Sequence, residues 1–305
     1  MPAPTSSSGA RMKPRVAFLG LGTMGGPMAA NLARAGFDVH GWNRSSGRAT
    51  AIDAARAGVR VEPDIETAVR DASVVCVCVG DVPDVEQVLF AAQGAASAVR
   101  PGTLLIDFST IGPAAARDFA ARAAQRDLRF LDAPVTGGDV GARAGTLTIM
   151  VGGQAADFDE AKPFFAAVGR LAKHCGESGA GQAVKLCNNT LAALHMVALS
   201  EALLLARRQG IDPALVVEVC STGAAGSWAL QNLGPKVLDR DFAPGFMVKH
   251  LVKDLRLVLE TPGDELDELK GVILAKGLLE RVMEVGGADL GTQSMTLAYE
   301  KPRRR

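Results

Sequence analysis

The chain has 305 residues, of which 48% are hydrophobic and 22% charged, and its 33 basic and 33 acidic residues cancel. This length predicts two domains, and the balanced charge argues against a nucleic acid or another polyanion as a partner. The five cysteines are odd in number and form no CxxC pair, which indicates reduced thiols, a cytoplasmic location and no structural zinc.

The first 13 residues lack the apolar core of a signal peptide, and a disordered lead-in is expected there. No apolar run reaches membrane-spanning length without a charge, so a membrane segment is not expected.

Residues 14–179 alternate short apolar runs with helical patterns. The predicted strands are 15–20, 37–43, 73–80, 102–110, 128–134 and 145–153, and predicted helices include 24–35, 84–100 and 113–127. This alternation predicts a parallel sheet with right-handed crossovers, and the continuous apolar character predicts burial on both faces.

Residues 180–305 show no such alternation. Helical patterns dominate instead, at 181–209, 213–220, 227–239, 247–260 and 265–286, with Gly- and Pro-containing breaks between them. The expected fold class is therefore α/β: a Rossmann-type, doubly wound parallel sheet followed by an all-α C-terminal domain.

The stretch "GLGTMG", Gly20 to Gly25, places the GxGxxG pattern directly after the first strand. Gly20 permits a tight turn, Gly22 lets the backbone approach a pyrophosphate, and Gly25 lets the helix pack closely. A glycine-rich turn can also occur without a ligand, but the position at the head of the first βαβ unit favours a dinucleotide site. Its other expected members are Leu21, Thr23 and Met24.

The second strand ends in "GWNRSS", where an acidic residue would normally bind the ribose of NAD. Asn43 occupies that position and Arg44 follows it. A guanidinium can bind a 2′-phosphate through paired, charge-assisted hydrogen bonds, so NADP(H) is favoured and NAD(H) remains an alternative. Arg48 is a possible second cation, and an exposed loop arginine is the alternative interpretation of Arg44.

Lys185 and Asn189 head a helical stretch that is apolar nearly all round. They are four residues apart, so they share one helix face, which continues through Ala192 and Met196. The nearest acid on this helix, Glu201, is roughly 24 Å along the axis and cannot be the partner of Lys185. Because buried polar groups need partners, a ligand or another segment must supply them, which favours an active site over a solvated first turn.

Five ordered motifs between Arg15 and Leu297 resemble the β-hydroxyacid dehydrogenase family, which includes 3-hydroxyisobutyrate dehydrogenases and tartronate, glyoxylate and succinic semialdehyde reductases. The motifs are "FLGLGTMGGPMAANLARAGFDVHGWNR", "LIDFSTI", "FLDAPVTGGDVGARAGTLTIMVGG", "GAGQAVKLCNN" and "FAPGFMVKHLVKDLRLVL".

The resemblance implies roles for individual residues. Lys185 is expected to be the general acid/base, and Asn189 to hydrogen-bond the substrate hydroxyl. Thr136, Gly137 and Gly138 would bind the substrate carboxylate, where threonine in place of serine adds a methyl group. The remaining expected contacts are Val79, Thr110 and Lys253 for the cofactor, and Phe246 and Asp254 for the substrate.

The expected function is an NADP(H)-dependent oxidoreductase that interconverts a short β- or ω-hydroxy acid and its semialdehyde. An NAD-dependent 3-hydroxyisobutyrate dehydrogenase, an imine reductase and a non-catalytic cofactor-binding module are the alternatives, and the presence of Lys185 argues against the last two. The resemblance also implies a homodimer or homotetramer. The four histidines are expected to be structural, and the scattered acids indicate no metal site.

Overall fold

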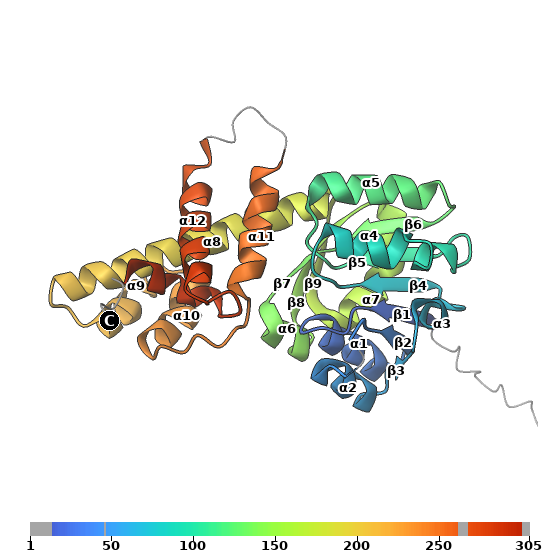
Figure 1. Ribbon diagram of the computed structural model, residues 1–305, viewed down its shortest axis with the longest axis horizontal. Helices are drawn as coiled ribbons and strands as arrows, with labels where there is room; N and C mark the ends of the chain where they lie inside the picture. Colours follow the sequence, from blue (N-terminus) through green and yellow to red (C-terminus); the bar gives the residue numbers. More distant parts are fainter. Residues whose placement is uncertain (1–13, 46, 262–267, 301–305) are drawn as a thin grey trace, which may run out of the picture.

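The computed structural model describes residues 14–45, 47–261 and 268–300, which form a sheet-containing domain followed by a helical domain (Figure 1). The lead-in expected at 1–13 and the first residues of the helix expected at 265–286 lie outside the described residues.

One nine-stranded sheet forms the first domain, in the order β3-β2-β1-β4-β5-β6-β8-β7, with β9 paired to β8. Its strands are β1 (Arg15–Leu19), β2 (Asp38–Trp42), β3 (Arg60–Val61), β4 (Val74–Val77), β5 (Leu104–Asp107), β6 (Arg129–Asp132), β7 (Val135–Thr136), β8 (Leu147–Gly152) and β9 (Gly169–Gly176). The strand order reverses between β1 and β4, and ligands of such sheets bind at the carboxyl ends of the strands at that point.

The prediction of a parallel sheet is confirmed from β3 to β6 and is wrong for the strand expected at 145–153. β8 pairs antiparallel with both β6 and β7. Residues 137–146 alone connect β7 to β8, which turns the chain back at the same edge instead of carrying it across the sheet.

Alternate residues of the central strands enter different cores, which explains their continuous apolar character. Val16 and Phe18 face one set of helices, and Ala17 and Leu19 face the other. The first set is α1 (Gly25–Arg34), α2 (Ala49–Arg56) and α7 (Ala155–Val168), and the second is α3 (Ile65–Val69), α4 (Val82–Phe90) and α5 (Gly112–Ala124). The short α6 (Gly138–Ala144) lies between β7 and β8.

The helix expected at 84–100 is two shorter pieces. α4 ends at Phe90, and the 3₁₀ turn η1 (Ala95–Ser97) follows. A Cβ at Gly94 would lie 2.7 Å from the backbone carbonyl of Leu89, so the chain folds back tightly there and cannot continue the helix.

The second domain is built around α8 (Ala180–Arg208), which runs from the sheet domain through the helical one (Figure 1). The other elements are α9 (Pro213–Cys220), α10 (Trp228–Leu238), α11 (Val248–Leu259), α12 (Lys270–Glu284) and the 3₁₀ helix η3 (Thr292–Tyr299). By length and composition α8 could cross a membrane, but Leu186, Met196 and Leu203 share a buried core with α11 and α12. In this structure α8 is the central helix of a folded domain.

Candidate active site

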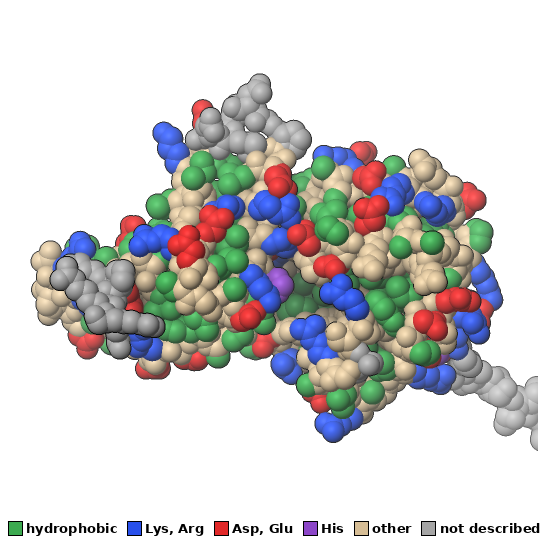
Figure 2. Space-filling model, in the orientation of Figure 1, with side chains coloured by type: hydrophobic (Ala, Val, Ile, Leu, Met, Phe, Trp, Pro, Cys, Tyr) green, Lys and Arg blue, Asp and Glu red, His purple; other side chains and the backbone are tan. Residues whose placement is uncertain are grey.

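A cleft of about 2420 Å³ lies between the domains, and Lys and Arg side chains gather around the hollow that Figure 2 shows there. The carboxyl ends of β1, β2, β4 and β5 line one part of it. The segment 135–141, α8, α11 and the loop 243–247 line the other.

The glycine turn has the geometry that the sequence predicts. Gly20 has φ +100°, and a Cβ at Gly25 would overlap the carbonyl oxygen of Gly20. A Cβ at Gly22 would meet only Arg48 Nη1, at 3.8 Å, so the backbone here is open to the cleft. This open cradle at the head of α1 fits the pyrophosphate of a dinucleotide.

Three further residues of this turn were expected to contact the cofactor. Thr23 and Met24 line the cleft, whereas the side chain of Leu21 is fully buried in the core and does not. Leu21 contributes through its backbone, because its N–H donates to Asn43 Oδ1 at 3.0 Å. The Leu21 side chain points into the core because it is apolar.

Asn43 and Arg44 act differently at the end of β2. The side chain of Asn43 accepts from Leu21 and donates to the Ser45 carbonyl oxygen at 2.8 Å, so it fixes the glycine turn. Arg44 lines the cleft, its side chain is 74% exposed, and Nη1 lies 3.2 Å from Asp84 Oδ1.

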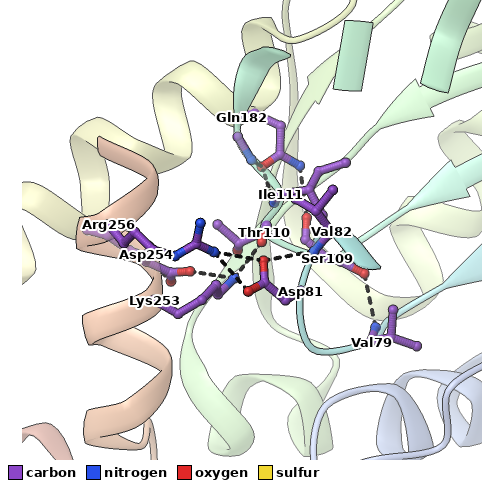
Figure 3. Close-up of polar contacts among 12 residues, drawn as sticks. Val79, Asp81, Val82, Ser109, Thr110, Ile111, Gln182, Lys253, Asp254 and Arg256 are labelled. Atoms are coloured by element: carbon purple, nitrogen blue, oxygen red, sulfur yellow. Dashed lines mark hydrogen bonds and ion pairs between the residues drawn. The ribbon is translucent and has the colours of Figure 1, made fainter. Parts of the chain in front are cut away.

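The loops after β4 and β5 are joined to each other and to α11 (Figure 3). The Val79 N–H donates to Ser109 Oγ at 2.9 Å, and Lys253 Nζ donates to the Thr110 carbonyl oxygen at 2.5 Å. Arg256 Nη2 reaches both carboxylate oxygens of Asp81, at 2.8 and 3.2 Å. Two cations of α11 thus bind the strand-end loops on which Val79 and Thr110 line the cleft.

Two residues that were not predicted, Asp132 and Gln182, hold the head of α8. Asp132 accepts from the N–H groups of Gly179 at 2.7 Å and Gln182 at 2.9 Å. The Gln182 side chain accepts from Ile111 N–H at 3.0 Å and donates to the Ser109 carbonyl oxygen at 2.8 Å (Figure 3). Both side chains are fully buried. In the sequence, the available sign of their role was that each is a polar residue within a motif quoted above, "FLDAPVTGG" for Asp132 and "GAGQAVKLCNN" for Gln182.

Lys185 lies one turn beyond this anchor and is only 7% exposed. Burial lowers the pKa of Lys185 to about 8; nearby Asp254 raises it and Lys253 lowers it further. The Phe246 ring centroid is 5.9 Å from Lys185 Nζ. Among the described residues no hydrogen bond or ion pair occupies this amine, so it is free to act on a ligand in the cleft.

Of the buried polar pair Lys185 and Asn189 on α8, Asn189 has its partner on α11. Asn189 Nδ2 donates to Asp254 Oδ2 at 2.5 Å, and Asp254 Oδ1 lies 2.7 Å from Lys253 Nζ. Asn189 Oδ1 accepts from Asn188 at 3.0 Å. Asn189 therefore has a protein partner already, and its contact with a substrate hydroxyl remains a prediction.

The predicted carboxylate-binding segment lines the same cleft. Gly137 and Gly138 have φ +131° and +63°, values that favour glycine, and Thr136 is partly buried beside them. A Cβ at Gly138 would lie 3.5 Å from the Gly245 carbonyl oxygen, which places this turn against the loop that carries Phe246. The structure thus brings the expected substrate contacts of both domains together.

Two histidines expected to be structural, His195 and His250, also line the cleft. The His250 ring stacks on Phe246 with centroids 6.5 Å apart, and burial lowers the pKa of His250. These contacts make His250 a wall of the cleft beside Phe246.

Asp107 carries a buried carboxylate, and its Oδ2 has no hydrogen-bond partner in the part of the chain that the structure describes. Burial raises its pKa to about 6; hydrogen bonds from Ser109 oppose this shift and the charge of Asp132 adds to it. The folded state therefore holds this proton more tightly than the unfolded state does, and stability is lost as pH rises from about 4 to 6.

Asp107→Asn should therefore raise the free energy of unfolding by about 1–3 kcal/mol at pH 8 and by roughly half as much at pH 5. The amide retains an oxygen for Ser109 N–H and removes the buried charge. Urea unfolding at both pH values measures the difference, with the exposed Asp53→Asn as the control. Equal gains at the two pH values would contradict this assignment.

Two family models together match the chain from residue 15 to 299. The family described as the NAD-binding domain of 6-phosphogluconate dehydrogenase matches 15–179, and the family described as NAD-binding of NADP-dependent 3-hydroxyisobutyrate dehydrogenase matches 179–299.

Similar proteins extend over almost the whole chain. An uncharacterised oxidoreductase of Synechocystis is 50% identical, covering 94% of this chain and 98% of its own. The NAD-dependent L-serine dehydrogenase of Pseudomonas aeruginosa is 37% identical (90% and 94%), and the 2-hydroxy-3-oxopropionate reductase of Escherichia coli is 35% identical (94% and 97%). A solved Mycobacterium tuberculosis 3-hydroxyisobutyrate dehydrogenase with L-serine has a TM-score of 0.84 at 33% identity (95% and 100%).

The chain is a two-domain, nicotinamide-dinucleotide-binding oxidoreductase that acts on the CH–OH group of hydroxy acids. It belongs to the β-hydroxyacid dehydrogenase family, as the resemblance of its motifs predicted.

Proposed function

We propose that the protein is an NADP(H)-dependent enzyme that interconverts a short β- or ω-hydroxy acid and its semialdehyde, with Lys185 as the general acid/base. The observation that carries this proposal is the buried Lys185 amine in the cleft between the domains, which has no hydrogen bond or ion pair with any described residue. A bound nicotinamide cofactor supplies or accepts the hydride.

The residues of the chain supply the proton and the orientation. In the reducing direction an ammonium at Lys185 donates a proton to the carbonyl oxygen, and in the oxidising direction the neutral amine removes it. A pKa near 8 gives access to both forms close to neutral pH. Burial and the neighbouring Phe246 ring limit the water around this nitrogen.

Substrate orientation is assigned to the turn after β7 and to the pair from α8 and α11. The Thr136 hydroxyl and the backbone N–H groups of Gly137 and Gly138 would bind the carboxylate, because successive exposed N–H groups form an anion-binding concavity. Asn189, held by Asp254, would hydrogen-bond the substrate hydroxyl. Lys253 would stand beside the nicotinamide, since it binds the Thr110 carbonyl oxygen.

The preference for NADP(H) rests on Arg44 at the cleft and on the absence of a carboxylate at Asn43. The description of the second family model as NADP-dependent supports it. The alternative is an NAD-dependent 3-hydroxyisobutyrate dehydrogenase, and the Pseudomonas relative named as NAD-dependent favours that alternative.

Arg44→Gln should lower kcat/KM for NADP(H) by about 10- to 100-fold and change that for NAD(H) less than threefold, because it removes charge-assisted hydrogen bonds to the 2′-phosphate alone. Steady-state rates with both cofactors, measured on glyoxylate and on succinic, methylmalonic and tartronic semialdehydes, test the cofactor and the substrate together. A wild-type preference for NAD(H) would refute the assignment of Arg44, and no turnover of any of these substrates would refute the reaction class.

We also propose a soluble, cytoplasmic homodimer or homotetramer assembled through the helical domain. Large apolar side chains are exposed on α8 (Val184, Leu191, Leu205) and α12 (Ile273, Leu274). Exposed apolar side chains that gather into a contiguous patch typically mark protein interfaces, and these two helices are where such a patch is expected.

A further inference from the structure

The proposed phosphate-binding arginine already has an anionic neighbour inside the cleft. Asp84, in the first turn of α4, lies 3.2 Å from Arg44 Nη1, and both residues line the cleft. A Cβ at Gly80 would lie 2.8 Å from Asp84 Oδ2, so this carboxylate rests against the bare backbone of Gly80. The loop after β2 thus provides the arginine of this pair, and the first turn of α4 provides the aspartate.

The other charged groups at this end of the cleft do not share that contact. Asp64 accepts from Thr67 N–H on its own helix, and Glu66 lies 3.7 Å from Arg70. In the described parts of the chain Arg48 makes no side-chain ion pair or hydrogen bond, and its Nη1 lies beside Gly22. The carboxylate that competes for Arg44 is therefore that of Asp84.

We propose that Asp84 is a specificity-determining residue, which limits the affinity for dinucleotides with a 2′-phosphate by competing with that phosphate for Arg44. This inference rests on the proposed function, in which Arg44 binds the phosphate. An incoming phosphate with a charge of about −2 must displace the carboxylate or share the guanidinium with it. NAD(H) lacks the 2′-phosphate and so does not compete with Asp84 for Arg44. Asp84 therefore lowers the ratio of NADP(H) affinity to NAD(H) affinity.

The size of the effect follows from the exposure of the pair. The side chains of Arg44 and Asp84 are 74% and 34% exposed, and ion pairs of this kind contribute little to stability. Removing the competitor should therefore tighten the binding of a 2′-phosphate by about twofold to fivefold. The gain should shrink as the salt concentration rises, because the charges are screened.

Direct binding measurements on the full chain test this proposal without turnover. Adenosine 2′,5′-bisphosphate and adenosine 5′-monophosphate differ only in the 2′-phosphate, and titration calorimetry gives both affinities. Asp84→Asn should bind the bisphosphate two- to fivefold more tightly and the monophosphate with unchanged affinity. Asp53→Asn, which removes the same charge from an exposed pair outside the cleft lining, should change neither.

A double-mutant cycle with Arg44→Gln identifies the route of the effect. In that background Asp84→Asn should no longer tighten bisphosphate binding; an equal gain would show repulsion that bypasses Arg44 and would overturn the proposal. Absence of any gain in the wild-type background would overturn it as well. Arg44→Gln alone separates this inference from the proposed function: if it leaves bisphosphate affinity unchanged, the assignment of Arg44 itself has failed.

Discussion

Replacing Lys185 by alanine should lower kcat by about 10³-fold in both directions, because a positioned proton donor and acceptor contributes roughly 10²–10⁴ to the rate. The affinity for the cofactor should change less than threefold, since the glycine turn and Arg44 lie on other elements. Stopped-flow reduction and oxidation, together with cofactor titration, measure the two effects separately. Turnover close to that of the wild type would refute the role of Lys185.

The role of Lys185 also predicts opposite pH dependences for the two directions of the reaction. Oxidation requires the neutral amine, so kcat/KM for the alcohol should rise with pH and level off above about 8, while reduction requires the ammonium and should decline above it. Lys185→Met, which retains an apolar stem of similar length, should lose this ionisation from both profiles. If the ionisation near pH 8 persisted in that variant, another group would have to be its source.

Asp132→Ala is expected to have the second-largest effect. It leaves the N–H groups of Gly179 and Gln182 buried without an acceptor, which should lower the free energy of unfolding by about 2–4 kcal/mol. Because Lys185 follows one turn later, a small displacement of the helix start should also lower kcat by about 10- to 100-fold. Urea unfolding and steady-state kinetics measure both.

Asp132→Asn serves as the matched variant. It has nearly the same volume and keeps one acceptor oxygen, so it should lose less stability than the alanine variant and recover part of kcat. A decrease in kcat without any rescue by asparagine, or a stability equal to the wild type for alanine, would show that the carboxylate does not position α8.

Much of the fold follows from local sequence patterns, and the exceptions are features that apolar periodicity does not report. The central strands are buried on both faces, so their apolar runs are plain in the sequence. β9 was not predicted, because only partly buried and exposed residues form it and no apolar period marks it. The antiparallel direction of β8 depends on the path of the connection from β7, which apolar periodicity does not report.

The candidate site divides in the same way. The glycine turn and the spacing of Lys185 and Asn189 are local features, and both could be predicted from the chain. Contacts between distant segments could not: Asn189 meets Asp254 across 65 positions, and Gln182 meets Asp132 across 50. Helical spacing showed only that Lys185 and Asn189 needed partners, and the fold supplied Asp254.

The buried amide of Gln182 has a consequence for accuracy of placement. Its oxygen accepts from the backbone N–H groups of Ile111 and Gly112, and its nitrogen donates to the carbonyl oxygen of Ser109. The start of α8 is thus fixed at several points to the loop that joins β5 to α5. The position of a side chain becomes less certain with each flexible segment that separates it from a fixed contact. Here a single helical turn separates the hydrogen bonds of Gln182 from Lys185. The position of the Lys185 amine relative to the sheet is therefore set mainly by this anchored start of α8.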